Sequence, residues 1–335
     1  MSAPRISIIT PSYQQAAYLE ECIISVHSQG QNVEHIVVDG GSTDGSKAII
    51  EQHADRFAWW CSEKDKGQSD AINKGLAHAT GDVFTWVNSD DALLPNAITR
   101  VQEAFSADPG LLVFGGRVVH RDVNGDRVFQ RLNDAGDHAQ VFCDPVINQP
   151  ATFYRMAAVQ AIGGVDPALR YVMDVELWWQ LLFKHGTEHL RFEPVELATF
   201  RLHEASKTVT AHEGFLRELA TLLHDMCERA GDPEMARAIA RGYPDRPRLR
   251  GIPVERTAHG PMVRSMAIHF VLKWHGLVHN EAGFNMLKAL HDAALVDERC
   301  LLPGMGVRWN KARRQVAGST WNRYRVRRKL KHLFG

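Results

Sequence analysis

The sequence predicts an α/β protein built on a largely parallel sheet with helices on its faces. Short β-branched runs alternate with stretches of helical periodicity, which is the pattern of a layered α/β fold. Polar clusters directly follow the runs that end at Ile9, Val38 and Val87. Because ligands of such sheets bind beyond the carboxyl ends of the strands, these clusters predict where the functional site lies.

Each strand-like run is short and apolar and is followed by residues that end a strand. These runs are 6–10, 34–38, 58–62, 83–87 and 111–114. The helix-like stretches between and after them are 16–29, 46–57, 68–79 and 95–107. Pro11 ends the first strand, and Leu19 and Ile23 recur at helical spacing in the first helix. The second helix can be capped by Ser42, Thr43 or Asp44.

Beyond residue 117 the pattern becomes mixed and then helical. Strand-like pieces occur at 128–129 and 151–154, and a helical stripe occupies 174–185. After about residue 205 two amphipathic helices, near 215–226 and 262–277, flank a Pro- and Arg-rich linker. We therefore expect one domain over 1–205 and a helical C-terminal extension over 206–335.

Composition excludes several classes of protein. The 335 residues contain 39 Lys and Arg against 39 Asp and Glu, with 44% hydrophobic and 23% charged residues. These values exclude a disordered chain, a collagen-like repeat and a polycation. Five cysteines without a C-x-x-C pair argue against a disulfide framework or structural zinc, and favour reduced thiols in the cytoplasm. No apolar stretch reaches 18 residues, so no membrane-spanning segment is expected.

The run Asn88-Ser89-Asp90-Asp91 has two adjacent acids at a predicted strand end. Adjacent carboxylates repel each other, which a shared Mg²⁺ or Mn²⁺ or a set of hydrogen bonds would relieve. The alternative is an ordinary turn with helix-capping acids.

Weaker candidates taken alone are Asp39, Asp174 and His203. Asp39 can accept a base N–H or simply belong to a turn, and Asp174 can be a general base or a helix cap. His203 can ligate a metal or be an ordinary histidine.

Together the motifs resemble the family 2 glycosyltransferases, which have the GT-A fold, a Rossmann-like mixed sheet flanked by helices. The matching segments, in order, are Thr10-Pro11-Ser12-Tyr13, Val37-Val38-Asp39-Gly40-Gly41-Ser42-Thr43-Asp44-Gly45, Asn73-Lys74-Gly75, Thr80-Gly81-Asp82, Asn88-Ser89-Asp90-Asp91, and Asp174 before Glu176-Leu177-Trp178. The resemblance covers about residues 5–205. Two departures are Gly40 and Asn88, where many members have an acid.

The resemblance implies a hexosyltransferase-type enzyme (EC 2.4) with a nucleotide-sugar donor, a divalent cation (Mn²⁺ or Mg²⁺) and an inverting transfer. It implies the following roles: the nucleoside pocket for Pro11 and Tyr13, the base for Asp39, the donor border for Asp65 and Asn73, the ribose or sugar for Asp90, the metal for Asp91 and His203, and the catalytic base for Asp174.

The implied function is transfer from a UDP-sugar to a glycan or lipid-linked acceptor in cell-surface polysaccharide synthesis. Two alternatives stay open. A nucleotidyltransferase shares the sheet and metal acids, but would need a glycine- and arginine-rich phosphate loop that Thr10-Pro11-Ser12-Tyr13 is not. A non-catalytic assembly protein could keep the fold and bind a membrane through its tail.

The C-terminal segment is strongly basic. Residues 299–335 contain eleven Lys and Arg and no Asp or Glu, which leaves 28 basic and 39 acidic residues in 1–298. Val326, Leu330, Leu333 and Phe334 share a helical face, with Trp321 and Tyr324 nearby. This pattern favours peripheral contact of 305–335 with the anionic inner face of the cell membrane. The alternatives are a solvated basic end and a helix packed on the domain, and no nucleic-acid partner is expected because no recognised nucleic-acid-binding fold accompanies the charge.

Overall fold

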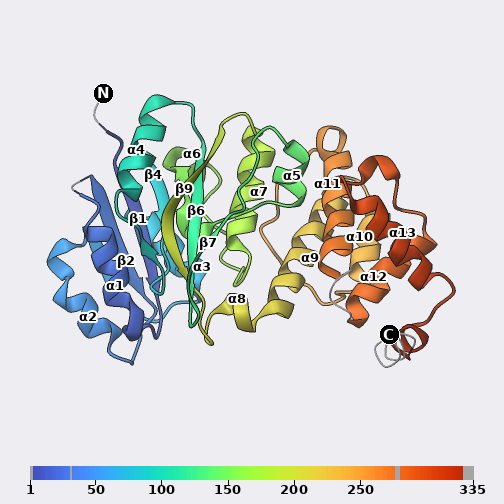
Figure 1. Ribbon diagram of the computed structural model, residues 1–335, viewed down its shortest axis with the longest axis horizontal. Coiled ribbons are helices and arrows are strands. Elements are labelled where there is room, and N and C mark those ends of the chain that lie inside the picture. Colours follow the sequence, from blue (N-terminus) through green and yellow to red (C-terminus); the bar gives the residue numbers. More distant parts are fainter. Residues whose placement is uncertain (1–2, 31, 276–279, 327–335) are drawn as a thin grey trace. The chain divides into compact units, whose positions relative to one another are not determined.

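The computed structural model describes residues 3–30, 32–275 and 280–326, which form two compact units (Figure 1). The first unit comprises Met1–Asp137 and Val146–His212, and the second comprises His138–Pro145 and Glu213–Gly335. The eight residues His138–Pro145 therefore belong to the second unit, although the residues before and after them belong to the first.

The first unit is built on a mixed sheet of nine strands with the order β3-β2-β1-β4-β8-β6-β9-β5, and β7 pairs with β6. The strands are β1 (Ile6–Ser12), β2 (Val33–Asp39), β3 (Trp59–Ser62), β4 (Val83–Trp86), β5 (Ala92–Leu93), β6 (Val113–Asp122), β7 (Gly125–Phe129), β8 (Thr152–Arg155) and β9 (Leu190–Arg201).

The parallel arrangement expected from the sequence holds in the N-terminal half of this sheet. There β1 pairs in parallel with β2 and β4, and β2 with β3. In the other half β8 runs antiparallel to both β4 and β6, while β6 and β9 are parallel. The carboxyl ends of β1, β2 and β4 therefore lie together at one edge, which is where the polar clusters begin.

Helices flank the sheet of the first unit (Figure 1). They are α1 (Ala16–His27), α2 (Ser46–Gln52), α3 (Gln68–Leu76), α4 (Ala97–Ala107), α6 (Met156–Ala161), α7 (Met173–His185) and α8 (Lys207–Thr210), with short 3₁₀ turns at Ala54–Arg56 and Gln149–Ala151. Alternation along β1 explains the two covered faces, because successive side chains point to opposite sides of a strand. Ile6 and Ile8 join the core cluster that includes residues of α1 and α4, whereas Ile9 lies against Gly75 of α3. A Cβ on Gly75 would come within 2.6 Å of Ile9 Cγ2, so α3 can pack this closely only with glycine there.

Several boundaries differ from those expected. α2 ends at Gln52, because a 3₁₀ turn replaces the rest of the predicted helix. The longest strand, β9, was not predicted, because its burial does not alternate cleanly and its run of apolar residues is interrupted by Glu193, Pro194 and Glu196.

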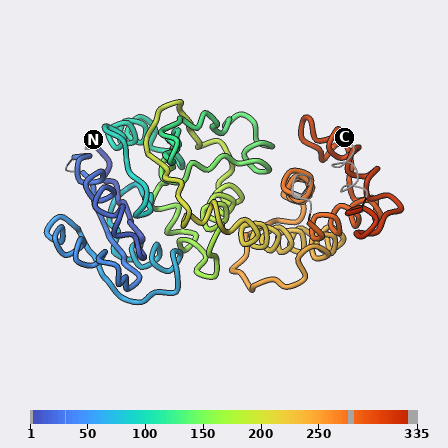
Figure 2. Tube along the Cα trace, turned by 60° about the horizontal axis from the view of Figure 1, so that its bottom comes forward, coloured from blue at the N-terminus to red at the C-terminus, as the bar shows by residue number. Residues whose placement is uncertain are grey.

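The second unit consists of helices in the part that the structure describes (Figure 2). They are α5 (His138–Cys143), α9 (His212–Arg229, which begins at the last residue of the first unit), α10 (Pro233–Ala240), α11 (Arg256–Phe270), a π-helical turn (Val271–His275), α12 (Glu281–Asp292), a 3₁₀ turn (Glu298–Cys300) and α13 (Met305–Val316). Within the described residues, no helix is both long and apolar enough to cross a membrane.

The basic C-terminal segment begins as a helix packed within this second unit. The apolar side of α13 is buried, and its buried residues are Met305, Trp309, Ala312 and Val316. Trp321 and Tyr324 pack against Phe284, with ring centroids 5.7 and 5.0 Å from that of Phe284. The predicted face containing Leu330, Leu333 and Phe334 lies outside the described residues.

Candidate active site

The turn after β2 is organised by Asp39, whose side chain is fully buried. Its Oδ2 accepts hydrogen bonds from the backbone N–H groups of Gly41 and Ser42 at 3.2 and 2.9 Å. The hydroxyls of Ser42 and Ser62 donate to Oδ1 and Oδ2 at 2.5 and 2.6 Å. A carboxylate offers about four lone pairs, so little acceptor capacity is left for a ligand. Asp39 therefore acts first as the residue that shapes the turn.

Asp65 lies directly beside this turn. Its Oδ1 accepts the N–H of Gly67 at 2.8 Å, and its Oδ2 is 2.8 Å from the position that a Cβ on Gly40 would occupy. A side chain at position 40 would therefore displace the Asp65 carboxylate. The absence of an acid at position 40, which the sequence showed as a departure from the family pattern, is matched here by an acid that reaches the same place from residue 65.

The loop after Asp39 also holds the start of α1. Asp44 accepts the N–H of Ala16 through Oδ2 at 2.9 Å and the N–H of Ser46 through Oδ1 at 3.1 Å, so one carboxylate serves the N-termini of α1 and α2. Burial would raise the pKa of Asp44, but these hydrogen bonds leave it below its ordinary value. Gln14 has a positive φ of 55° and donates its N–H to Ser42 Oγ at 2.8 Å. This left-handed residue was not identified from the sequence.

Asp91, after β4, is a buried acid with few partners. Its Oδ1 accepts the N–H of Arg201 at 2.9 Å, and its Oδ2 is 3.3 Å from Asn88 Nδ2. Burial raises the pKa of Asp91 well above its ordinary value, and the neighbouring charge of Asp90 acts in the same direction. The hydrogen bonds do not compensate for the loss of water.

Asp90 lies beside His203, with 3.0 Å between Asp90 Oδ2 and His203 Nε2. The two atoms are joined by a hydrogen bond, and the carboxylates of Asp90 and Asp91 are the kind of ligand that Mg²⁺ and Mn²⁺ prefer. A hard cation of this kind is usually held by one or two protein carboxylates together with substrate phosphates. The residues therefore fit a divalent cation that is completed by a diphosphate. The described residues contain no group of three or more His, Cys, Asp and Glu side chains that could hold a metal by themselves.

Asn88 connects the acids to two glutamine side chains. Its Oδ1 accepts from Gln68 Nε2 at 2.6 Å, and its Nδ2 is 3.2 Å from Gln149 Oε1 as well as near Asp91. Gln149 in turn donates to the carbonyl of Trp86 at 2.7 Å. An amide can accept on one side and donate on the other, which a carboxylate at position 88 could not do. Neither glutamine was identified from the sequence.

The remaining predicted residues fall in different surroundings. Pro11 is buried at the end of β1, Tyr13 is 61% exposed, and the buried hydroxyl of Ser12 between them has no hydrogen-bond partner among the described residues. Asn73 uses both ends of its amide on the backbone of Val165, at 2.8 and 3.1 Å, so it clamps α3 to that loop.

Asp174 lies in the first turn of α7, where its Oδ1 accepts the N–H of Val175 at 2.9 Å. Burial raises the pKa of the Tyr154 phenol, and the negative charge of Asp174 acts in the same direction.

Arg201 is the main residue of the site that sequence reasoning did not assign. It ends β9, and its guanidinium Nε donates to the carbonyl of Asp90 at 3.0 Å. The available signal was its position two residues before His203, which in an extended segment places both side chains on one side.

The mixed sheet of nine strands has its acids gathered beyond the carboxyl ends of β2 and β4, which is where α/β sheets bind their ligands. The family profile described as "Glycosyl transferase family 2" matches residues 7–163. An uncharacterized glycosyltransferase of Mycobacterium tuberculosis is 34% identical over 184 residues, which cover 52% of this chain and 68% of the relative. One from a Nostoc species is 37% identical over 229 residues, covering 62% and 67%.

Solved structures agree on the fold. The S. aureus TarS 1–349 structure in complex with UDP-GlcNAc has a TM-score of 0.64 at 14% identity, covering 93% of this chain and 90% of that one. Mannosyltransferase PcManGT from Pyrobaculum calidifontis, in complex with GDP-Man and Mn²⁺, has a TM-score of 0.54 at 17% identity, covering 99% and 88%. The chain belongs to glycosyl transferase family 2 and has the GT-A fold. It is a glycosyltransferase that takes a sugar from a nucleotide-sugar donor.

Proposed function

We propose that the protein transfers a sugar from a UDP-sugar to a hydroxyl of a glycan or lipid-linked acceptor, with inversion, in the synthesis of a cell-surface polysaccharide. The observation that carries the site assignment is the Asp90–His203 pair beside Asp91, beyond the end of β4. The TarS complex with UDP-GlcNAc supports the choice of a uridine nucleotide.

In this proposal Asp91 and His203 hold the divalent cation together with the donor diphosphate. Asp90, which lies 3.0 Å from His203, borders the ribose or sugar of the donor. When bound, the cation would neutralise charge on the leaving diphosphate. The Mn²⁺ in the PcManGT complex supports a divalent metal ion as this cation.

The donor would lie along the carboxyl edge of β1 and β2. Pro11 and Tyr13 border the nucleoside, and the unpartnered Ser12 hydroxyl between them supports a polar ligand there. Asp65 has more free acceptor capacity than Asp39 and is the better candidate to accept a base N–H. Asn73 contributes through the loop that it clamps.

Asp174 would take the proton from the acceptor hydroxyl as that oxygen attacks the anomeric carbon. Its place in the first turn of α7 supports the ionised form, because the helix N-terminus favours negative charge. One displacement inverts the configuration, so no second nucleophile is needed. Orienting the two substrates can supply roughly 7–11 kcal/mol of the barrier.

The direct test is transfer by Asp174→Asn. Loss of a general base typically lowers the rate by about 10²–10⁴-fold, while donor binding should stay unchanged. Glu234→Gln, which alters an exposed first-turn acid of α10, is the matched control. Full activity of Asp174→Asn would place the base elsewhere.

A screen of nucleotide sugars by thermal stabilisation, with and without Mn²⁺, identifies the donor. A ligand at 100 times its Kd should add about 2.7 kcal/mol to the free energy of unfolding. Stabilisation by no nucleotide sugar would favour the non-catalytic alternative. Transfer of a nucleotidyl group from a nucleoside triphosphate would favour the nucleotidyltransferase.

We also propose that the second unit contacts an anionic membrane surface through the exposed side of α13. Exposed cations there are Arg308, Lys311, Arg313 and Arg314, and none forms an ion pair within the described part of the chain. Because the apolar side of α13 is buried, we expect electrostatic adsorption, worth about 1 kcal/mol per cation near the surface, with no insertion of this helix.

Vesicle sedimentation with the full chain tests this contact. Binding to vesicles rich in phosphatidylglycerol, none to phosphatidylcholine, and loss of binding in about 0.5 M salt are expected, since the Debye length shrinks to a few Å. The double variant Lys311→Glu and Arg314→Glu should release the protein, and the control with Arg237→Glu on α10 and Arg241→Glu directly after it should not. Equal binding by both variants would contradict the proposal.

A further inference from the structure

Arg201 contacts both acids of the turn after β4. Its backbone N–H donates to Asp91 Oδ1 at 2.9 Å, and its Nε donates to the carbonyl oxygen of Asp90 at 3.0 Å. The residue at the end of β9 is therefore bonded to the carboxylate of Asp91 through its backbone and to the backbone of Asp90 through its side chain. Its side chain is only 16% exposed, so these contacts are sheltered from water.

Helix α1 holds the guanidinium of Arg201 from the other side. Glu21 Oε2 accepts from Arg201 Nη2 at 2.6 Å, and the guanidinium carbon lies 4.9 Å from the centroid of the Tyr18 ring. The Tyr18 ring is also 4.9 Å from the His203 ring. Tyr18 and Glu21 are three residues apart and share one side of the helix. One side of α1 thus contacts both Arg201 and His203.

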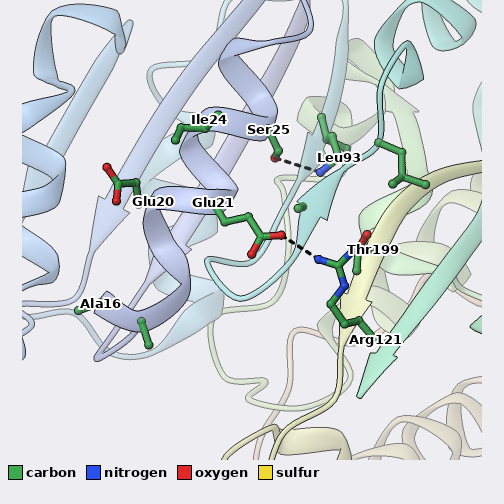
Figure 3. A pocket seen from close by; sticks show the side chains of 11 residues that line it. Ala16, Glu20, Glu21, Ile24, Ser25, Leu93, Arg121 and Thr199 are labelled. Atoms are coloured by element: carbon green, nitrogen blue, oxygen red, sulfur yellow. Dashed lines mark hydrogen bonds and ion pairs between the residues drawn. The ribbon is translucent and has the colours of Figure 1, made fainter. Parts of the chain in front are cut away.

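Glu21 is in turn fixed by the β6–β7 hairpin. Its Oε1 accepts from Arg121 Nη1 at 2.9 Å (Figure 3), and Arg121 makes a two-point contact with Asp126, with both distances 2.9 Å. Figure 3 shows this ion pair among the side chains that line a pocket. The pocket lies between α1, β5 and β9 and has a volume of about 540 Å³. The charges therefore alternate from Asp126 to Arg121, Glu21 and Arg201, and end at the turn of Asp90 and Asp91.

We propose that Arg201 is the positioning residue for the Asp90–His203 pair and Asp91, and that Glu21 and Tyr18 fix its guanidinium. This inference rests on the proposed cation and diphosphate site. Only arginine suits the place, because its planar group donates from Nε to a carbonyl and from Nη2 to a carboxylate at the same time. Lysine would keep the charge and the backbone N–H, but its single ammonium nitrogen does not reproduce the fixed geometry of Nε and Nη2.

The test is the affinity of the full chain for Mn²⁺ in the presence of UDP, measured by electron paramagnetic resonance. Loss of an outer residue that orients metal ligands typically costs about 10–100-fold in metal affinity, and we expect this for Arg201→Lys. Glu21→Gln should weaken binding in the same direction by less. Because Glu21 is 49% exposed, this second variant keeps the proposal falsifiable if Arg201→Lys folds poorly.

Arg100→Lys is the matched control. Arg100 joins α4 to Glu193 of β9 through Nε and Nη2 at 2.8 and 2.6 Å, which is the same kind of helix-to-strand link at a place away from the turn of Asp90 and Asp91. Its Mn²⁺ affinity should stay within about twofold of wild type, well short of the outer-residue effect. Equal Mn²⁺ affinity in wild type, Arg201→Lys and Glu21→Gln would overturn the positioning role of Arg201 but leave the proposed cation site standing. Absence of Mn²⁺-dependent UDP binding in the wild type would refute the proposed cation site and this inference with it.

Discussion

Two buried carboxylates lie at opposite ends of the neighbouring strands β2, β1 and β4, and their surroundings differ. At the amino end, Glu34 accepts hydrogen bonds from the Ser7 hydroxyl at 2.5 Å and from the N–H and hydroxyl of Thr80, both at 2.7 Å, and Arg5 lies 3.2 Å away. At the carboxyl end, Asp91 has one good backbone donor and the charge of Asp90 next to it.

These surroundings shift the pKa values of the two acids in opposite directions. Burial would raise the pKa of Glu34, but the hydrogen bonds from Ser7 and Thr80 and the charge of Arg5 leave it below its ordinary value. Burial raises the pKa of Asp91, and Asp90 adds to that shift. The comparison teaches that the amino end of the sheet is a completed structural clamp, while the carboxyl end has negative charge that the protein alone does not balance.

Among the variants that test this comparison, Asp91→Asn gives the largest expected effect. Charge stabilisation at a leaving diphosphate is worth several kcal/mol, so kcat/KM for transfer should fall by about 10²–10³-fold. The melting temperature should change little, because the amide oxygen still accepts the Arg201 N–H, and removal of a buried charge offsets the new amide donor that faces Asn88 Nδ2. Initial rates and a thermal scan measure both. Retained activity with lost stability would make Asp91 another structural clamp.

Glu34→Ala tests the opposite end. Removing the carboxylate leaves the buried donors of Ser7 and Thr80 unpaired, which should lower the free energy of unfolding by about 2–4 kcal/mol. The rate of the folded enzyme should be unchanged. Urea unfolding measures the loss, and Glu20→Ala, at a side chain 59% exposed, is the control. A loss no larger than that of the control would remove the distinction between the two ends.

Asn88→Asp would sharpen the comparison by adding negative charge at the carboxyl end. The new carboxylate would face Asp91 Oδ2 and Gln149 Oε1, where Asn88 now donates. We expect a loss of about 1–3 kcal/mol in urea unfolding without ligand. Mn²⁺ with UDP should reduce that loss, because a cation offsets the added charge. A loss of stability that is the same with and without ligand would count against a cation at this end.

The smallest expected effect is in the pH dependence of stability. Glu34 has a folded-state pKa below the ordinary value of 4.5, so its contribution is present above that pH and is lost as the pH falls through the lowered value. The difference in free energy of unfolding between wild type and Glu34→Gln should therefore be constant near neutral pH and shrink below about pH 4.5. Urea unfolding from about pH 7 to about pH 3 measures it, and a constant difference over that range would contradict the assignment.

The strands that line the site could be predicted, because each is a short apolar run followed by polar turn residues. β1, β2 and β4 lie where the sequence placed them to within two residues. β9 could not be predicted from the sequence, because part of it is exposed and its burial does not alternate. Its end nevertheless supplies Arg201 and leads to His203, which explains why sequence reasoning found the acids and missed the residue that joins them.

By itself the sequence determined the α/β alternation, the strand-end acids and a basic segment of 299–335, because each depends on residues that are neighbours along the chain. Only the tertiary structure decided that His203 lies beside Asp90, that Arg201 contacts both acids across 110 residues, and that the apolar side of α13 is covered. Side-chain pairing between distant strands depends on sheet register and helix packing, and neither can be predicted from the spacing of residues along the chain.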